Sequence, residues 1–94
     1  MTEKFSRYDT ADYLNTAEEM ALYFEACLEE NDPALIAHAL GVIARARGMT
    51  QLAKDTGISR EGLYKALSAD GNPEFATILK VTRALGIKLH AEMV

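Results

Sequence analysis

Apolar residues recur three and four positions apart along most of the chain, a spacing that predicts a succession of amphipathic helices. The first predicted helix covers about residues 17–30. It begins with a capping box, in which the Thr16 hydroxyl and the Glu19 carboxylate each accept a hydrogen bond from the other residue's backbone. The stripe expected to be buried consists of Ala17, Met20, Ala21, Phe24 and Leu28.

A second helix is predicted from Pro33 to about Arg47. Asp32 is a favourable N-cap, and proline suits the first helical position because its missing N–H has no intrahelical partner there. Gly48 follows the last helical residue, where glycine commonly ends a helix. The residues expected to face the core are Leu35, Ile36, Ala39, Leu40 and Ile43.

Residues 49–68 have the pattern of two short helices joined by a tight turn. Gly57 occupies the turn, where a positive φ is needed, and Ser59 is placed to N-cap the second helix. This pattern is typical of helix-turn-helix units, whose second helix enters the DNA major groove, although a plain helical hairpin has it too. The residues expected to face inward are Leu52, Ala53, Leu63, Ala66 and Leu67.

The outer face of the second short helix carries side chains suited to reading DNA. Arg60 is the best candidate for a bidentate hydrogen bond to guanine. Gly62 in the same helix is explained either by close approach to DNA or by packing. Thr50 and Gln51 open the first short helix, where side chains and backbone N–H groups contact phosphates or cap the helix. The set expected to face the groove is Ser59, Arg60, Glu61, Tyr64 and Lys65.

The last third of the chain predicts one more helix and one strand. A Gly-Asn-Pro loop at residues 71–73 leads into a helix of about residues 74–85, with Asn72 as its N-cap. Apolar and polar residues then alternate over residues 87–94. A lone strand leaves its backbone unpaired, so we expect it to pair antiparallel with the same strand of a second subunit, a frayed tail being the alternative. The expected dimer residues are Ile87, Leu89, Ala91 and Met93.

The length of 94 residues suits a single domain, residues 1–94, with an N-terminal arm over residues 1–15, a helical part over residues 16–86 and the strand over residues 87–94. No apolar run is long enough to cross a bilayer, and the N-terminus lacks the features of a secretion signal. The single cysteine, Cys27, suits a reducing compartment and a small core position. We therefore expect a cytoplasmic protein without membrane contact.

Charge is divided unevenly along the chain, whose net charge is −4. Residues 1–40 hold two basic and nine acidic residues, a net −7, whereas residues 41–94 hold eight basic and five acidic residues, a net +3. The division favours a polyanion as partner of the second half and a basic partner for the first half, although acidic residues also simply solvate an exposed helix. The surface for the basic partner is expected at Tyr8, Tyr13, Leu22, Tyr23, Glu25 and Glu29.

No pattern typical of an enzyme, a cofactor site or a metal site is present. His38 and His90 have no His, Cys or carboxylate partner at metal-ligand spacing. The sequence also lacks a phosphate-binding loop and a nucleophile–base pair. We therefore expect neither catalysis nor a cofactor.

Two resemblances follow from these segments. The helix pair, the Gly-Asn-Pro loop and a packing helix that ends in Leu85-Gly86-Ile87 resemble the lambda-repressor-like, Cro/XRE-type DNA-binding domains. Over about residues 8–90 the chain resembles the HigA-like antitoxins, which are addiction-module antidote proteins of bacterial type II toxin–antitoxin pairs. The segments that carry this second resemblance are residues 13–16, 23–28, 39–49, 57–67 and 71–73.

The resemblance implies an all-α, five-helix lambda-repressor-like domain with an N-terminal arm and a short C-terminal β-strand used for dimerisation. It implies that the protein neutralises a small basic toxin of the RelE/ParE superfamily and, as a homodimer, represses the shared operon on palindromic double-stranded DNA. The loop of Asn72 is then near the DNA backbone, so the phosphate-positioning residues are expected to be Arg45, Gln51, Lys54 and Asn72.

Two alternatives share part of this interpretation. A phage-type or housekeeping repressor without a toxin partner has the same DNA chemistry but leaves the acidic first half unexplained. A pure inhibitor whose helix-turn-helix is only structural leaves the basic outer face of the second short helix unexplained.

Overall fold

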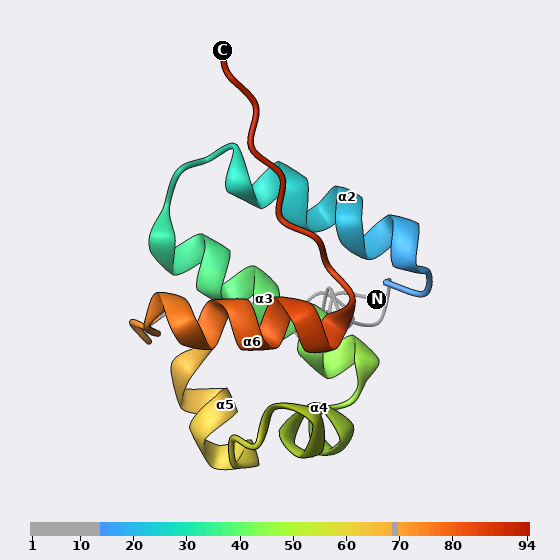
Figure 1. Ribbon diagram of the computed structural model, residues 1–94, viewed down its shortest axis with the longest axis vertical. Coiled ribbons are helices and arrows are strands. Elements are labelled where there is room, and N and C mark those ends of the chain that lie inside the picture. Colours follow the sequence, from blue (N-terminus) through green and yellow to red (C-terminus); the bar gives the residue numbers. More distant parts are fainter. Residues whose placement is uncertain (1–13, 69) are drawn as a thin grey trace, which may run out of the picture.

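The computed structural model describes residues 14–68 and 70–94 (Figure 1). Within these residues no strand is present, and every regular element is a helix, so the described fold is all-α. Each predicted helix is found within two residues of its expected ends. The helices are α2 (Ala17–Leu28), α3 (Pro33–Arg47), α4 (Met49–Thr56), α5 (Arg60–Ala66) and α6 (Phe75–Leu85).

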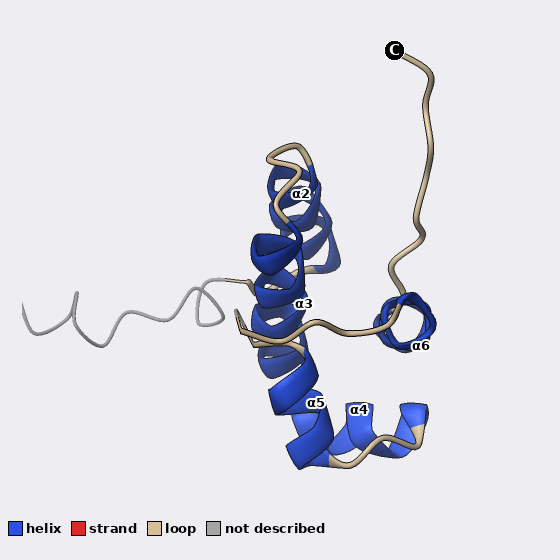
Figure 2. Ribbon diagram, turned by 90° about the vertical axis from the view of Figure 1, so that its left-hand side faces the viewer, coloured by secondary structure: helices blue, strands red, loops and turns tan. Residues whose placement is uncertain are grey.

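Helix α3 lies at the centre of the arrangement, since it contacts α2, α4, α5 and α6. Among the described helices, α2 contacts only α3, whereas α4 also contacts α5 and α6. Figures 1 and 2 both place α2 at one end of the molecule and α4 and α5 at the opposite end. A partner bound at one of these ends therefore leaves the other end accessible.

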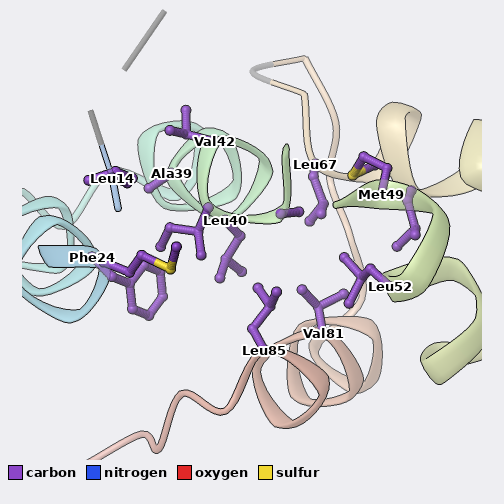
Figure 3. Close-up of a cluster of buried hydrophobic side chains, with 14 of the residues drawn as sticks. Leu14, Phe24, Ala39, Leu40, Val42, Met49, Leu52, Leu67, Val81 and Leu85 are labelled. Atoms are coloured by element: carbon purple, nitrogen blue, oxygen red, sulfur yellow. The ribbon is translucent and has the colours of Figure 1, made fainter. Parts of the chain in front are cut away.

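In the described part of the chain, one cluster of buried side chains joins the helices. Leu40 and Ile43 of α3, Leu63 of α5 and Val81 of α6 are almost completely shielded from water. Figure 3 shows Leu40 on α3 facing Leu85 and Val81 on α6. Burial of each such aliphatic side chain contributes about 1.5–3 kcal/mol to folding. The position of α5 is therefore fixed by the same core that holds α3 and α6 together.

The predicted N-caps of α2 and α3 are confirmed. The Thr16 hydroxyl accepts a hydrogen bond from the backbone N–H of Glu19 at 3.1 Å, and a Glu19 carboxylate oxygen accepts one from the Thr16 N–H at 3.1 Å. The Asp32 carboxylate accepts from the N–H of Ala34 at 3.1 Å. Gly48, with φ at 114°, ends α3 and begins α4. Local sequence therefore determines where these helices begin.

The buried stripe of α2 is narrower than predicted. Met20 and Phe24 are buried as expected, and Cys27 joins them. Because α2 packs against α3 alone, no second described helix covers the neighbouring side of α2. The members of the predicted stripe that are exposed for this reason are Ala17, Ala21 and Leu28.

The start of α6 also differs from the prediction. The N-cap is Glu74, and Asn72 does not cap the helix. Glu74 itself has extended backbone, with φ at −66° and ψ at 153°, so the first helical turn lies too far along the chain for the Asn72 side chain. Asn72 is left in an exposed loop, and Phe75 at the first helical position is 69% exposed.

Residues 87–94 leave α6 as an extended tail, and the predicted strand is absent from the single chain. Gly86, with φ at 79°, ends α6, and the N–H of Ile87 donates to the carbonyl of Thr82 at 2.8 Å. From Lys88 onward no backbone–backbone hydrogen bond is formed within the described chain. Figure 2 shows this tail rising from the end of α6. A strand needs a paired backbone, which one copy of the tail does not supply.

Candidate functional site

The turn between α4 and α5 is fixed by hydrogen bonds at both ends. The Thr56 hydroxyl donates to the carbonyl of Leu52 at 2.8 Å and accepts from the N–H of Ile58 at 3.2 Å. Gly57 has the predicted left-handed backbone, with φ at 75°. The Ser59 hydroxyl accepts from the N–H of Gly62 at 3.0 Å, which confirms Ser59 as the N-cap of α5.

Thr56 stabilises this turn through its side chain, a role that the sequence pattern did not single out. Its hydroxyl serves the last turn of α4 and the first residue after Gly57, a local pattern that Ser and Thr side chains favour. A threonine directly before the turn glycine was the available signal. Thr56 therefore helps to set the angle at which α5 leaves α4.

Helix α5 divides into a buried and an exposed side as predicted. Leu63 and Leu67 are buried in the core. The guanidinium carbon of Arg60 lies 5.9 Å from the centre of the Tyr64 ring, one helical turn along. Such a contact over the ring face is a cation–π interaction. The predicted groove-facing side chains are all exposed: Ser59, Arg60, Glu61, Tyr64 and Lys65.

Gly62 has a packing role in this helix. A Cβ atom at this position would lie 3.1 Å from the Ser59 hydroxyl oxygen and 3.2 Å from a methyl carbon of Ile58. Both contacts are tighter than ordinary van der Waals contact, and one involves the N-cap itself. The sequence left packing and approach to DNA as alternatives, and the structure supplies a reason within the folded chain.

Some of the predicted phosphate-positioning residues surround α5. Arg45 of α3 lines a surface hollow together with Tyr64, and Asn72 lines a second hollow together with Lys65. These hollows flank α5 on two sides. The structure therefore brings a cationic residue of α3 and the Gly-Asn-Pro loop beside the exposed side of α5.

The residues of α4 that were predicted to contact phosphates differ in their surroundings. Thr50 and Lys54 are exposed. The Gln51 side chain donates to the Asp55 carboxylate at 2.9 Å and lines a small hollow with Arg47 beside the end of α6. Gln51 is therefore engaged with its own helix and turned toward α6 rather than joining the hollows beside α5.

The expected surface for a basic partner lies on the outer side of α2. Leu22 is 66% exposed, and Glu25 and Glu29 on the same helix are exposed as well. Tyr23 is half-buried against the core. Tyr8 and Tyr13 lie outside the described residues, and the described residue that follows them, Leu14, is buried. The structure thus places an apolar residue among carboxylates at the end of the molecule opposite α5.

The residues predicted to form a dimer contact become progressively more exposed along the tail. Ile87 is half-buried against the core, Leu89 is 39% exposed, and Met93 is 96% exposed. Ala91 is exposed as well. Three of the four apolar positions of the tail therefore remain available to a partner.

The described residues contain neither a cluster of metal ligands nor a membrane-spanning helix. Nowhere in residues 14–68 and 70–94 do three or more His, Cys, Asp or Glu side chains gather as metal ligands. Of the described helices, none combines the length and the apolar character needed to cross a membrane.

Comparison with known proteins assigns the chain to a family. The model of the family described as "Probable addiction module antidote protein" matches residues 4–93. A protein of Haemophilus influenzae (strain ATCC 51907 / DSM 11121 / KW20 / Rd), described as uncharacterized, is 52% identical over 92 residues, which cover 98% of this chain and 95% of that protein. No solved structure matches the chain. The chain therefore belongs to the family of probable addiction module antidote proteins, a description that implies a toxin as partner.

Proposed function

We propose that the protein is the antitoxin of a type II toxin–antitoxin module. It neutralises a toxin of the RelE/ParE superfamily, and as a homodimer it represses its own operon through a lambda-repressor-like helix-turn-helix formed by α4 and α5. Family membership supports the antidote role. The observation that carries the DNA-binding part is that α5 is anchored by buried Leu63 while Arg60 and Lys65 on the same helix remain exposed.

The exposed side of α5 has the chemistry of a recognition helix. An α-helix fits the major groove of B-DNA, and an arginine there donates two hydrogen bonds to the edge of a guanine. Arg60 occupies the first position of α5, the end of the helix that approaches bases in helix-turn-helix complexes. Arg45 and Asn72 flank this helix and are suited to hold phosphates. The net charge of +3 over residues 41–94 adds a general attraction for the DNA backbone.

The other end of the molecule suits a basic toxin. The outer side of α2 combines exposed Leu22 with the carboxylates of Glu25 and Glu29. An apolar anchor surrounded by acidic groups gives both area and charge complementarity to a basic surface. Since α2 and α5 lie at opposite ends, toxin and operator bind the same molecule without competing for one surface.

Titration of the DNA upstream of the operon tests the first part. Arg60→Ala should weaken binding by about 1–3 kcal/mol, or roughly 5- to 150-fold, and relax the preference for the operator over unrelated DNA. Arg83→Ala is the matched control, because it removes the same side chain and charge from an exposed position on α6. Equal affinity and selectivity of wild type and Arg60→Ala would contradict the assignment of α5 as the recognition helix.

Co-expression with the small reading frame adjacent to the gene tests the second part. The expected result is growth arrest by that reading frame, relief by this protein, and co-purification of the two. Deletion of residues 1–13 removes Tyr8 and Tyr13 from the expected toxin surface, so it should abolish relief while operator binding persists. This deletion retains buried Leu14. Full relief of growth arrest by the deleted protein would contradict a role of the arm in toxin binding. If the full chain does not relieve the arrest, the antitoxin role is wrong and a repressor without a toxin partner remains.

A further inference from the structure

The guanidinium of Arg60 has an aromatic ring as its neighbour rather than a carboxylate. Its central carbon lies over the Tyr64 ring, 5.9 Å from the ring centre. Within residues 14–68 and 70–94 no carboxylate forms an ion pair with Arg60. The Arg60 side chain is long and exposed, and such a side chain samples many rotamers unless a neighbour restricts it. The ring of Tyr64 is therefore the group that orients this guanidinium in the free protein.

Tyr64 is itself held against the body of the protein. It is 45% exposed, so part of the side chain is covered. It lines a hollow bounded by α3, α4 and α5, together with Met49 at the start of α4 and Leu67 at the end of α5. Both of these neighbours are buried in the core. The ring therefore has a defined place beside Arg60.

A contact with a ring suits an arginine that has to read a base. The guanidinium group is planar, so it stacks on an aromatic face while its N–H donors point outward in its own plane. Those donors remain available for the O6 and N7 acceptors of guanine in the major groove. An ion pair with a carboxylate would occupy the same donors, often two at a time. A ring therefore orients Arg60 without using the groups that contact DNA.

We propose that Tyr64 is a positioning residue for recognition of guanine by Arg60. Its ring restricts the guanidinium to the orientation that α5 presents to the groove, so less side-chain freedom is lost when the base is bound. The ring acts in this way, and the phenol hydroxyl does not. The inference rests on the proposed function and deepens it, because Tyr64 acts through Arg60 and not by its own contact with a base.

Titration of the operator with two Tyr64 variants tests which part of the side chain acts. Tyr64→Phe keeps the ring and should bind the operator as tightly as the wild type. Tyr64→Leu keeps an apolar side chain without a ring, and should lower operator affinity by about threefold to tenfold. If Tyr64→Phe is as weak as Tyr64→Leu, the hydroxyl contacts DNA and the proposal is overturned. Wild-type affinity of Tyr64→Leu overturns it as well.

Phe75→Leu is the matched control for loss of a ring. It replaces an aromatic residue by leucine at a position of α6 that is 69% exposed, and it should leave operator affinity unchanged. Circular dichroism checks that the Tyr64 and Phe75 variants remain helical. An equal loss of affinity in Phe75→Leu and Tyr64→Leu would show that the ring of Tyr64 has no special role, and would overturn the proposal.

Operators with single base-pair changes give a readout that a merely structural role does not move. The base pair read by Arg60 is the one at which Arg60→Ala loses discrimination. Tyr64→Leu should weaken discrimination at that same base pair and leave it unchanged at every other one. A uniform loss over all positions, or a loss confined to a different base pair, overturns the proposal.

A double-mutant cycle shows whether Tyr64 acts through Arg60. In the Arg60→Ala background, Tyr64→Leu should have no further effect on operator affinity, because the residue that the ring positions is gone. Additive losses would show that Tyr64 contacts DNA on its own, which overturns the proposal.

The same measurements separate this inference from the proposed function. If Arg60→Ala binds the operator with wild-type affinity and selectivity, the assignment of α5 as the recognition helix fails, and the role of Tyr64 fails with it. If Arg60→Ala relaxes the base preference while Tyr64→Leu leaves it intact, α5 remains the recognition helix and only the role of Tyr64 is wrong.

Discussion

The two ends of this molecule are built on different principles. At one end α5 has only seven residues, yet it is capped by Ser59 and held by the fully buried Leu63. At the other end α2 has twelve residues but packs against one helix and leaves part of its apolar stripe along an open groove. Helix α5 is therefore held in place by the core, whereas α2 leaves apolar surface exposed that a partner can cover.

This difference corresponds to what each surface is proposed to do. Reading bases requires side chains held in a fixed relation to the groove, because hydrogen bonds to base edges tolerate little displacement. Binding another protein depends on burial of apolar surface, which an uncovered helix side provides. If the ends differ in this way, a substitution that disturbs α5 should cost more than the same substitution on the outer side of α2.

The largest effect is expected from removing the anchor of α5. Leu63→Ala leaves a cavity at a site with no solvent exposure and should lower the free energy of unfolding by about 2–5 kcal/mol. Leu22→Ala makes the same change on the outer side of α2 and should alter it by no more than about 0.5 kcal/mol. Urea denaturation followed by circular dichroism measures both. Similar losses in the two variants would contradict the contrast between the ends.

A smaller loss of unfolding free energy is expected from Gly41→Ala, at the position where α3 meets the end of α5. A Cβ atom there would lie 2.6 Å from the backbone carbonyl oxygen of Leu67, so the helices must separate. Gly41→Ala should cost about 1–3 kcal/mol of unfolding free energy despite the better helix propensity of alanine. Gly62→Ala meets only the side chains of Ser59 and Ile58, at 3.1 Å and 3.2 Å, and gains helix propensity, so it should cost less than Gly41→Ala.

Thermal unfolding of both glycine variants checks this comparison. The expected order of unfolding midpoints is wild type highest, Gly62→Ala slightly lower and Gly41→Ala clearly the lowest. A Gly41→Ala variant as stable as wild type would show that α3 and α5 separate at little cost. The α5 end would then be less rigid than its burial indicates.

Local signals in the sequence were sufficient for the helices and for the turn. Thr16, Asp32, Gly57 and Ser59 all act as predicted, because a cap or a positive φ depends on a few neighbouring residues. The side of α5 that faces the core also followed from spacing alone, as Leu63 shows. These features need no knowledge of what lies elsewhere in the chain.

The errors concern features that depend on a distant neighbour. Ala17 and Ala21 have the spacing of core residues, but only the packing of α2 against a single helix shows that they stay exposed. Asn72 has the side chain of an N-cap, and the extended conformation of Glu74 displaces the helix start beyond its reach. The strand pattern of residues 87–94 likewise needs a partner that one chain does not contain.

The smallest effect on the free energy of unfolding is expected from removing the N-caps of α5 and α2, and these two changes also separate stability from DNA recognition. Ser59 and Thr16 cap α5 and α2 through equivalent hydrogen bonds to the backbone, at 3.0 Å and 3.1 Å. Replacing either by alanine should therefore cost a similar amount, about 1 kcal/mol of unfolding free energy. The consequences for DNA differ, because Ser59 directly precedes Arg60 at the start of α5.

Without its cap the first turn of α5 frays, and Arg60 loses the fixed position that a guanine contact requires. Ser59→Ala should therefore lower operator affinity several-fold, whereas Thr16→Ala should leave it unchanged at equal loss of stability. Parallel urea denaturation and operator titration of the two variants measure both quantities. If the two variants lost operator affinity equally, the effect would arise from global destabilisation, and the start of α5 would hold no special place in recognition.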